Sequence, residues 1–169
     1  NNKETNNLYM VLFNSGIFCP FNNTILLMIQ LLMEQPSYDF LRTKKQLGYL
    51  VSSGIVKKYP YYYLNIKIQS EKNIKVIEEN VNQFIKKFIS ILQDLDLEKI
   101  KTTTKEMLEE KLNSIEELNS RYKTEINNLT FMFNREKILI SQLNKISKND
   151  IIQYFNNILN NKSIIVINN

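Results

Sequence analysis

The spacing of apolar residues along the chain switches between the two-residue period of a strand and the 3.6-residue period of a helix. Short apolar runs at residues 8–13 and 163–168 predict strands that are buried. Residues 61–69 alternate apolar and polar side chains, and together with residues 49–57 they predict an antiparallel hairpin that turns at residues 58–60. One face of this hairpin is expected to be buried and the other wetter.

Two helices are expected before the hairpin. Residues 24–34 are apolar on almost every face, which predicts a buried helix, and Asn22 or Asn23 can cap its start. Pro36 is expected to end this helix and to open a short second one at residues 37–45.

The region between the hairpin and the last strand is predicted to be helical. Apolar residues repeat at helical spacing over residues 74–92, and a further helix, capped by its first residue, is expected at residues 96–112. Another is expected at residues 135–143. Ser114 and Ser147 each precede an acidic residue by three positions, which is the spacing of a capping box.

The order of these elements predicts an α+β fold, with a mostly antiparallel sheet of about four strands and helices packed on one face. A chain of 169 residues is long enough for one such domain with a core of its own. We therefore expect residues 1–169 to form a single domain.

Composition excludes several kinds of site. The chain has no histidine and a single cysteine, Cys19, which excludes imidazole bases and zinc sites built from His and Cys. Cys19 is expected to be a half-buried, unreactive thiol. Neighbouring carboxylates such as Glu78 with Glu79 and Glu109 with Glu110 point about 100° apart on a helix, so they do not converge. No metal site is predicted in this chain.

The net charge of +5 comes from 22 basic and 17 acidic residues that are mixed along the whole length. Such mixing is typical of a solvated surface, so no nucleic-acid partner is expected. A basic binding module remains an alternative, in which the tyrosines of residues 59–63 stack on bases or sugars. Tyrosine is also a common strand residue, and only binding that weakens steeply with salt would favour the module.

No membrane partner is expected, because the apolar run at residues 24–33 is too short to cross a bilayer and ends at Glu34. The first residues lack the character of a signal peptide. These features fit a soluble protein in a reducing compartment such as the cytoplasm or an organelle. They leave the compartment and the oligomeric state open, a homodimer included.

Between Arg42 and Tyr49 the spacing of apolar residues changes from the period of a helix to that of a strand. Arg42 lies near a helix end, where cations meet the negative end of the helix dipole, and Tyr49 begins a strand. Gln46, Leu47 and Gly48 form the corner between them, and Gly48 can take the left-handed conformation that closes a helix. On the residues alone, Arg42 can equally be a helix-end cation and Tyr49 a packed sheet residue.

The sequence of residues 40–51, Phe-Leu-Arg-Thr-Lys-Lys-Gln-Leu-Gly-Tyr-Leu-Val, closely resembles the Leu-Arg-Thr-Lys-x-Gln-Leu-Gly-Tyr-x-Val segment of the insulysin/pitrilysin (M16) zinc metallopeptidases. The resemblance continues into residues 68–72 and, less strictly, to residues 147–152. Lys45 departs from the family, which commonly has an acidic residue there, and its side chain is expected to face solvent. The chain is similar to the last, fourth-type domain of these enzymes, which has the LuxS/MPP-like fold.

This resemblance implies a fragment of a larger protease in which four related domains form two bowl-shaped halves around a peptide. The zinc site, an inverted His-x-x-Glu-His motif with a distant Glu, belongs to the first domain, so this chain alone is expected to bind no metal and to be inactive. Arg42 matches the residue that grips a substrate carbonyl, and Tyr49 matches the one that donates to the oxyanion. Gln46, Leu47 and Gly48 are implied to be structural. The implied partners are the N-terminal half of the same polypeptide and peptide substrates.

A catalytically inactive chamber or scaffold subunit of the same fold is the alternative within the family. The presence or absence of the His-x-x-Glu-His ligands upstream would discriminate between the two. Neither the peptide substrate nor the cleavage specificity is predicted.

Overall fold

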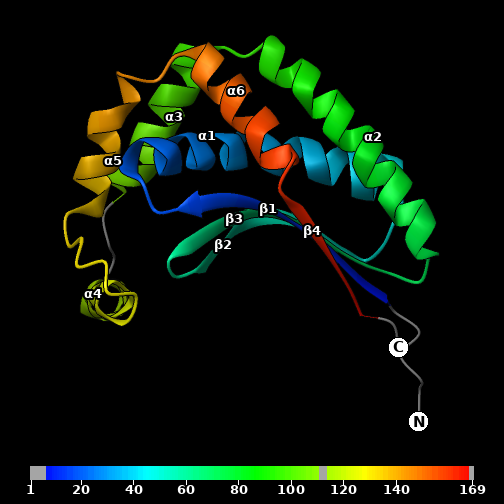
Figure 1. Ribbon diagram of the computed structural model, residues 1–169, viewed down its shortest axis with the longest axis horizontal. Coiled ribbons are helices and arrows are strands. Elements are labelled where there is room, and N and C mark those ends of the chain that lie inside the picture. The colour runs from blue at the N-terminus through cyan, green and yellow to red at the C-terminus, as the bar shows by residue number, and fades with distance from the viewer. Residues whose placement is uncertain (1–6, 111–113, 168–169) are drawn as a thin grey trace.

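The computed structural model describes residues 7–110 and 114–167. Its strands form one antiparallel sheet in the order β2-β3-β1-β4. They are β1 (Asn7–Ile17), β2 (Leu50–Lys58), β3 (Tyr61–Ser70) and β4 (Lys162–Ile167). Helices lie over one face of this sheet (Figure 1), so the predicted α+β fold is confirmed.

The helical elements all fall where helical periodicity was predicted, apart from differences at their ends. They are α1 (Pro20–Ser37), the π-helix η1 (Tyr38–Lys44), α2 (Ile74–Gln93), α3 (Leu97–Glu109), α4 (Ile115–Asn127), α5 (Arg135–Leu143) and α6 (Lys148–Leu159). The helix predicted at residues 96–112 ends at Glu109, and its last two predicted residues lie outside the described part of the chain. In Figure 1, α1 runs next to the sheet, while α4 stands apart from the helical layer at the side of the molecule.

The predicted hairpin is confirmed. Val51 pairs with Ile68 and Ile55 with Leu64 in an antiparallel ladder. Along β3, alternate residues are buried against the helices, and the residues between them are partly or fully exposed. The buried residues are Tyr62, Leu64, Ile66, Ile68 and Ser70.

Pro36 does not end the first helix as predicted. It lies inside α1, which continues to Ser37 and passes directly into η1. Proline removes one N–H donor from the helix. The hydroxyl of the buried Ser37, the next residue, donates to the Glu34 carbonyl (2.9 Å) and lies 3.1 Å from the Ser53 hydroxyl on β2. The end of α1 is therefore tied to the sheet.

The start of α1 also differs from the prediction. Cys19, in extended conformation, is the N-cap residue, and Asn23 lies one turn inside the helix, where its side-chain oxygen accepts from the Cys19 N–H (3.0 Å). The Cys19 residue is exposed, so the expectation of a half-buried thiol is wrong. It stands at the point where the chain turns from the end of β1 into α1.

β4 is a strand, but it is not buried as predicted. All its residues are exposed, with Ile164 at 39% and Ile167 at 52%. Among the strands of residues 7–110 and 114–167 it lies at the edge of the sheet and pairs with β1 alone. An apolar sequence alone does not distinguish a central strand from an edge strand.

Both predicted serine caps are present. The Ser114 hydroxyl oxygen accepts from the Glu117 N–H (3.1 Å) at the start of α4. At the start of α6, Ser147 accepts from the Asp150 N–H (3.2 Å), and the Asp150 carboxylate accepts from the Ser147 N–H (2.8 Å), which completes a capping box. The hydrogen bonds from Ser147 lower the pKa of the Asp150 carboxyl.

Replacing Ser147 with alanine is expected to lower the free energy of unfolding by about 1 kcal/mol, since one orphan N–H of α6 loses its acceptor. Urea unfolding followed by circular dichroism measures the loss. Ser90→Ala, at an exposed position inside α2, is the control and should leave stability unchanged or slightly raised. An equal loss in both variants would mean that the cap contributes nothing specific.

Candidate functional site

The predicted corner begins just after η1, at a residue in the left-handed conformation. The Gln46 N–H donates to the Arg42 carbonyl (3.0 Å), and the Leu47 N–H donates to the Leu41 carbonyl (3.1 Å). Gln46 has φ 49°, whereas Gly48 is not among the residues with positive φ. The residue that closes the helix is therefore Gln46, and the left-handed conformation expected at Gly48 lies two positions earlier.

Gly48 is needed for a different reason: at this position the backbone of the corner passes very close to the backbone of β3. A Cβ atom on Gly48 would lie 2.0 Å from the carbonyl oxygen and 2.9 Å from the carbonyl carbon of Gln69. Both are backbone atoms of a paired strand, so they cannot rotate away. Only glycine lets the chain pass this point, with the buried Leu47 anchored in the core beside it.

The end of β3 holds the corner by hydrogen bonds. The buried Ser70 hydroxyl donates to the Leu47 carbonyl and accepts from the Lys72 N–H (3.0 Å). The Lys72 ammonium donates to the Lys45 carbonyl (3.1 Å). Ser70 was not predicted to have a role, although it lies in the second stretch that resembles the family.

The structure brings Arg42 and Tyr49 side by side. The Arg42 guanidinium carbon lies 5.8 Å from the centre of the Tyr49 ring and 5.0 Å from that of Tyr38. Arg42 also donates a hydrogen bond to the Tyr38 hydroxyl. Tyr49 is 87% exposed, so it is not a residue packed on the sheet, which was the alternative interpretation. A cation and a phenol thus share one exposed surface, and Tyr38, which the sequence did not single out, orients the cation.

A hollow of about 220 Å³ opens next to this pair, between the end of α1 and the start of β2. Tyr38, whose hydroxyl accepts a hydrogen bond from Arg42, also lines the hollow. The lining offers a carboxylate, an amide and three hydroxyls around a valine. The lining residues are Glu34, Gln35, Tyr38, Val51, Ser52 and Ser53.

Lys45, whose side chain was expected to face solvent, also makes contacts within the domain. It is partly buried, its ammonium donates to the Gln83 side chain on α2 (3.0 Å), and it lies 5.4 Å from the centre of the Phe40 ring. α2 packs against η1 and provides this acceptor, which an acidic residue at position 45 could not use in the same way. The departure from the family motif therefore affects how α2 and η1 contact each other.

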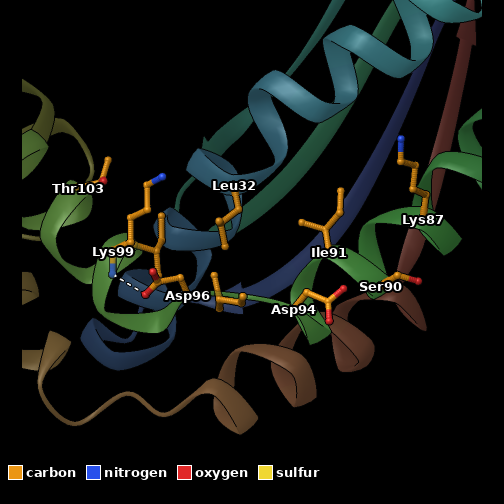
Figure 2. A pocket seen from close by; sticks show the side chains of 10 residues that line it. Leu32, Lys87, Ser90, Ile91, Asp94, Asp96, Lys99 and Thr103 are labelled. Carbon is orange, nitrogen blue, oxygen red and sulfur yellow. Dashed lines mark hydrogen bonds between the residues drawn. The ribbon is translucent and has the colours of Figure 1, made fainter.

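A larger hollow of about 490 Å³ lies among α1, α2 and α3 and includes none of the corner residues. Figure 2 shows Leu32 and Ile91 inside it, with the charged Lys87, Asp94 and Lys99 around them. The carboxylate of Asp96, in the same wall, accepts from the Lys99 N–H (3.1 Å) and caps α3. This hollow is therefore built around a helix start and is separate from the corner.

Neither a metal site nor a membrane-spanning helix is found in the described ranges. Among residues 7–110 and 114–167, no three His, Cys, Asp or Glu side chains lie where they could hold a metal ion together. No helix in the same ranges combines the length and the apolar character needed to cross a membrane. The donor set of these residues does not fit zinc.

Comparison with known proteins identifies the family. Residues 27–125 match the family model described as PQQ synthase PqqF-like, C-terminal lobe domain 4. The chain is a C-terminal domain of the M16 peptidase family. Over 136 residues it is 31% identical to the insulin-degrading enzyme of Drosophila melanogaster, a match that covers 79% of this chain and 14% of that enzyme. The resemblance seen in the sequence is confirmed.

Solved structures agree with this M16 assignment in their fold. The crystal structure of pitrilysin superposes with a TM-score of 0.81 at 13% identity, over 97% of this chain and 18% of pitrilysin. A structure described as the peptidase M16 inactive domain from Pseudomonas fluorescens gives 0.66 at 11% identity, over 96% of this chain and 40% of that one. This M16 domain therefore spans less than a fifth of the length of the fly relative and of pitrilysin.

Proposed function

We propose that this M16 domain is one domain of a larger, chamber-forming zinc metalloendopeptidase of the insulysin type, where it supplies substrate binding and oxyanion stabilisation. The observation that carries the proposal is the pairing of Arg42 with the exposed Tyr49 across a fixed corner. The family membership of the chain supports the reaction class.

The two side chains suit two different tasks. Arginine stays charged at all relevant pH values and carries several N–H donors, so Arg42 can bind Tyr38 and still grip a peptide carbonyl. Tyr49 has its ring in solvent and can offer its hydroxyl to the oxygen on which negative charge develops as water adds to that carbonyl. A donor placed at that oxygen typically accelerates such a reaction by about 10²–10³.

The proposal divides the chemistry between two parts of one polypeptide. Zinc, for which this domain has no fitting ligand set in its described residues, is assigned to the N-terminal half, which is also the partner of this domain. Peptides enclosed between the halves are the proposed substrates. The fragment alone is expected to cleave nothing.

Tyr49→Phe in the full-length parent tests the proposal. The variant keeps the ring beside Arg42 and removes only the hydroxyl, so kcat for peptide cleavage is expected to fall on the order of a hundredfold while the zinc content stays constant. Cleavage kinetics and zinc analysis of both proteins provide the measurement.

Tyr61→Phe is the matched control, because Tyr61 is also an exposed tyrosine of the same sheet but lies at the opposite end of the β2–β3 hairpin. It should leave kcat unchanged. Wild-type kcat in Tyr49→Phe would overturn the assignment of the oxyanion donor.

An inactive scaffold subunit is the second candidate, favoured by the likeness in fold to the inactive M16 domain from Pseudomonas fluorescens. A parent that contains no zinc and cleaves no peptide would support this role. In that case the Arg42–Tyr49 pair would serve peptide binding or packing alone.

A further inference from the structure

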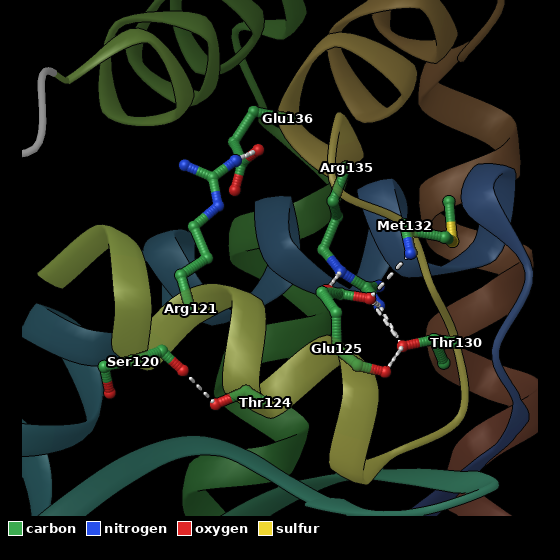
Figure 3. A network of polar contacts seen from close by, with 8 residues as sticks. All are labelled: Ser120, Arg121, Thr124, Glu125, Thr130, Met132, Arg135 and Glu136. Atoms are coloured by element: carbon green, nitrogen blue, oxygen red, sulfur yellow. Dashed lines mark hydrogen bonds and ion pairs between the residues drawn. The ribbon is translucent and has the colours of Figure 1, made fainter.

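α4 stands apart from the helical layer in Figure 1, and a buried charge network at its C-terminal end ties it to the start of α5 (Figure 3). Glu125 is only 5% exposed. Its carboxylate accepts hydrogen bonds from the Thr130 hydroxyl, from the Met132 N–H (3.1 Å) and from Arg135 at the start of α5 (2.8 Å). The network thus closes the α4–α5 loop onto α4.

The charges in this network are complementary and connect α4 to the body of the domain. Burial tends to raise the pKa of the Glu125 carboxyl, but hydrogen bonds from Arg135 and Thr130 outweigh it and lower the pKa to about 2. The Arg135 guanidinium carbon also lies 4.3 Å from the centre of the Phe18 ring, just beyond β1. One helical turn earlier, Arg121 pairs with Glu136 of α5. α4 is therefore fixed in position along one side.

Beside the anchored side, α4 exposes a row of apolar residues at helical spacing. The row consists of Ile115, Leu118, Tyr122 and Ile126, and Leu129, Phe131 and Phe133 of the following loop extend it; we call these seven residues the α4 stripe. Ile115 is 80% exposed, Ile126 50% and Leu129 64%. The rings of Tyr122 and Phe133 meet edge to face, with their centres 5.2 Å apart, so the loop part of the stripe contacts its helical part.

Such a helix gains little stability from its own sequence. Isolated helices shorter than about 12–15 residues are marginal in water, and most of their stability in proteins comes from burying an apolar face. α4 has 13 residues and leaves most of its apolar face in solvent. Contiguous exposed apolar surface of this kind is typical of an interface.

The length of the relatives indicates which partner covers it. The chain spans 14% of the fly insulin-degrading enzyme and 18% of pitrilysin, so most of such a polypeptide lies outside the structure. The polar residues of α4 carry both signs, with Glu116 and Lys123 as examples, which gives no basic face for a lipid surface. We infer that the α4 stripe docks against an apolar surface of another domain of the same polypeptide.

This inference goes beyond the proposed function and does not depend on Tyr49 or on catalysis. Its test in the full-length parent uses the photo-crosslinking residue p-benzoylphenylalanine in place of Ile126, on an equal mixture of unlabelled and ¹⁵N-labelled protein. Mass spectrometry then identifies the crosslinked peptides. The control has the same probe in place of Val76, a 41% exposed residue on α2.

We expect crosslinks from position 126 to residues outside this domain. In each crosslink, the two joined peptides should carry the same nitrogen isotope, because both belong to one chain. Crosslinks that join the two isotopes would show a second copy on the stripe and overturn the inference. A yield no higher than that at position 76 would show an uncovered stripe and overturn it as well.

Substitution gives an independent readout. Ile126→Ser in the parent is expected to lower the thermal midpoint of the parent by a few degrees, because a residue buried between domains becomes polar. Val76→Ser should leave the midpoint unchanged. Equal thermal midpoints for the two variants would contradict docking. Neither the crosslinking nor the thermal measurement requires activity, so both can be interpreted even if the parent cleaves no peptide.

Discussion

Arg135→Met is expected to lower the free energy of unfolding of the domain by about 3–5 kcal/mol, because it leaves the buried Glu125 carboxylate without its cation. Methionine keeps the length of the side chain, so the loss reflects charge and hydrogen bonding more than volume. Urea unfolding at pH 7, followed by circular dichroism, gives the value.

The double variant Arg135→Met/Glu125→Leu distinguishes a lost pair from lost packing. With both charges removed, no uncompensated carboxylate remains, and replacing a buried pair by apolar residues is often nearly neutral. The double variant should therefore recover most of the stability that Arg135→Met loses. A double variant as unstable as the single one would show that packing, and not the buried charge, causes the loss.

Gly48→Ala is expected to destabilise the domain by about 3 kcal/mol, the upper end of what overpacking costs. The added methyl group would lie 2.0 Å from the Gln69 carbonyl oxygen, so either β3 or the corner must move. In the full-length parent, the same change should lower kcat/KM for peptide cleavage although it alters neither Arg42 nor Tyr49. Urea unfolding of the domain and cleavage kinetics of the parent measure the two effects.

Gly54→Ala is the matched control, since it is also a glycine of the β2 region. Its added Cβ would meet only the flexible Asn65 side chain, at 3.4 Å. Stability and activity should stay near wild type. If the two alanine variants behaved alike, the close approach at Gly48 would be irrelevant to the corner.

Regular elements could be predicted from the sequence because their signals are local. The alternation in β3 and the serine caps of α4 and α6 each depend on residues within a few positions of one another. The failures came from tertiary context. Pro36 lies within α1, whose end is tied to β2 through Ser37, and β4 is an exposed edge strand that pairs with β1 along one side.

In the candidate site, too, local features could be predicted from the sequence and tertiary contacts could not. Arg42 and Tyr49 belong to one short motif, so sequence resemblance could place them together, and their assigned roles stay predictions. Ser70 acts on Leu47 from a different strand, and Glu125 meets Arg135 across a loop. No periodicity marks such contacts, because each depends on how two separate elements pack.

The restraints on the corner have a consequence for how the two site residues can move. Gln46 closes η1, Gly48 lies against the backbone of β3, and Ser70 holds the Leu47 carbonyl. Arg42 and Tyr49 are therefore attached to one rigid body, and any tilt of the domain rotates both by the same angle. In the proposed enzyme, a domain that swings away from the peptide would withdraw the cation and the hydroxyl in a single step. Substrate grip and rate acceleration would then switch on and off together, without a stage in which one acts alone.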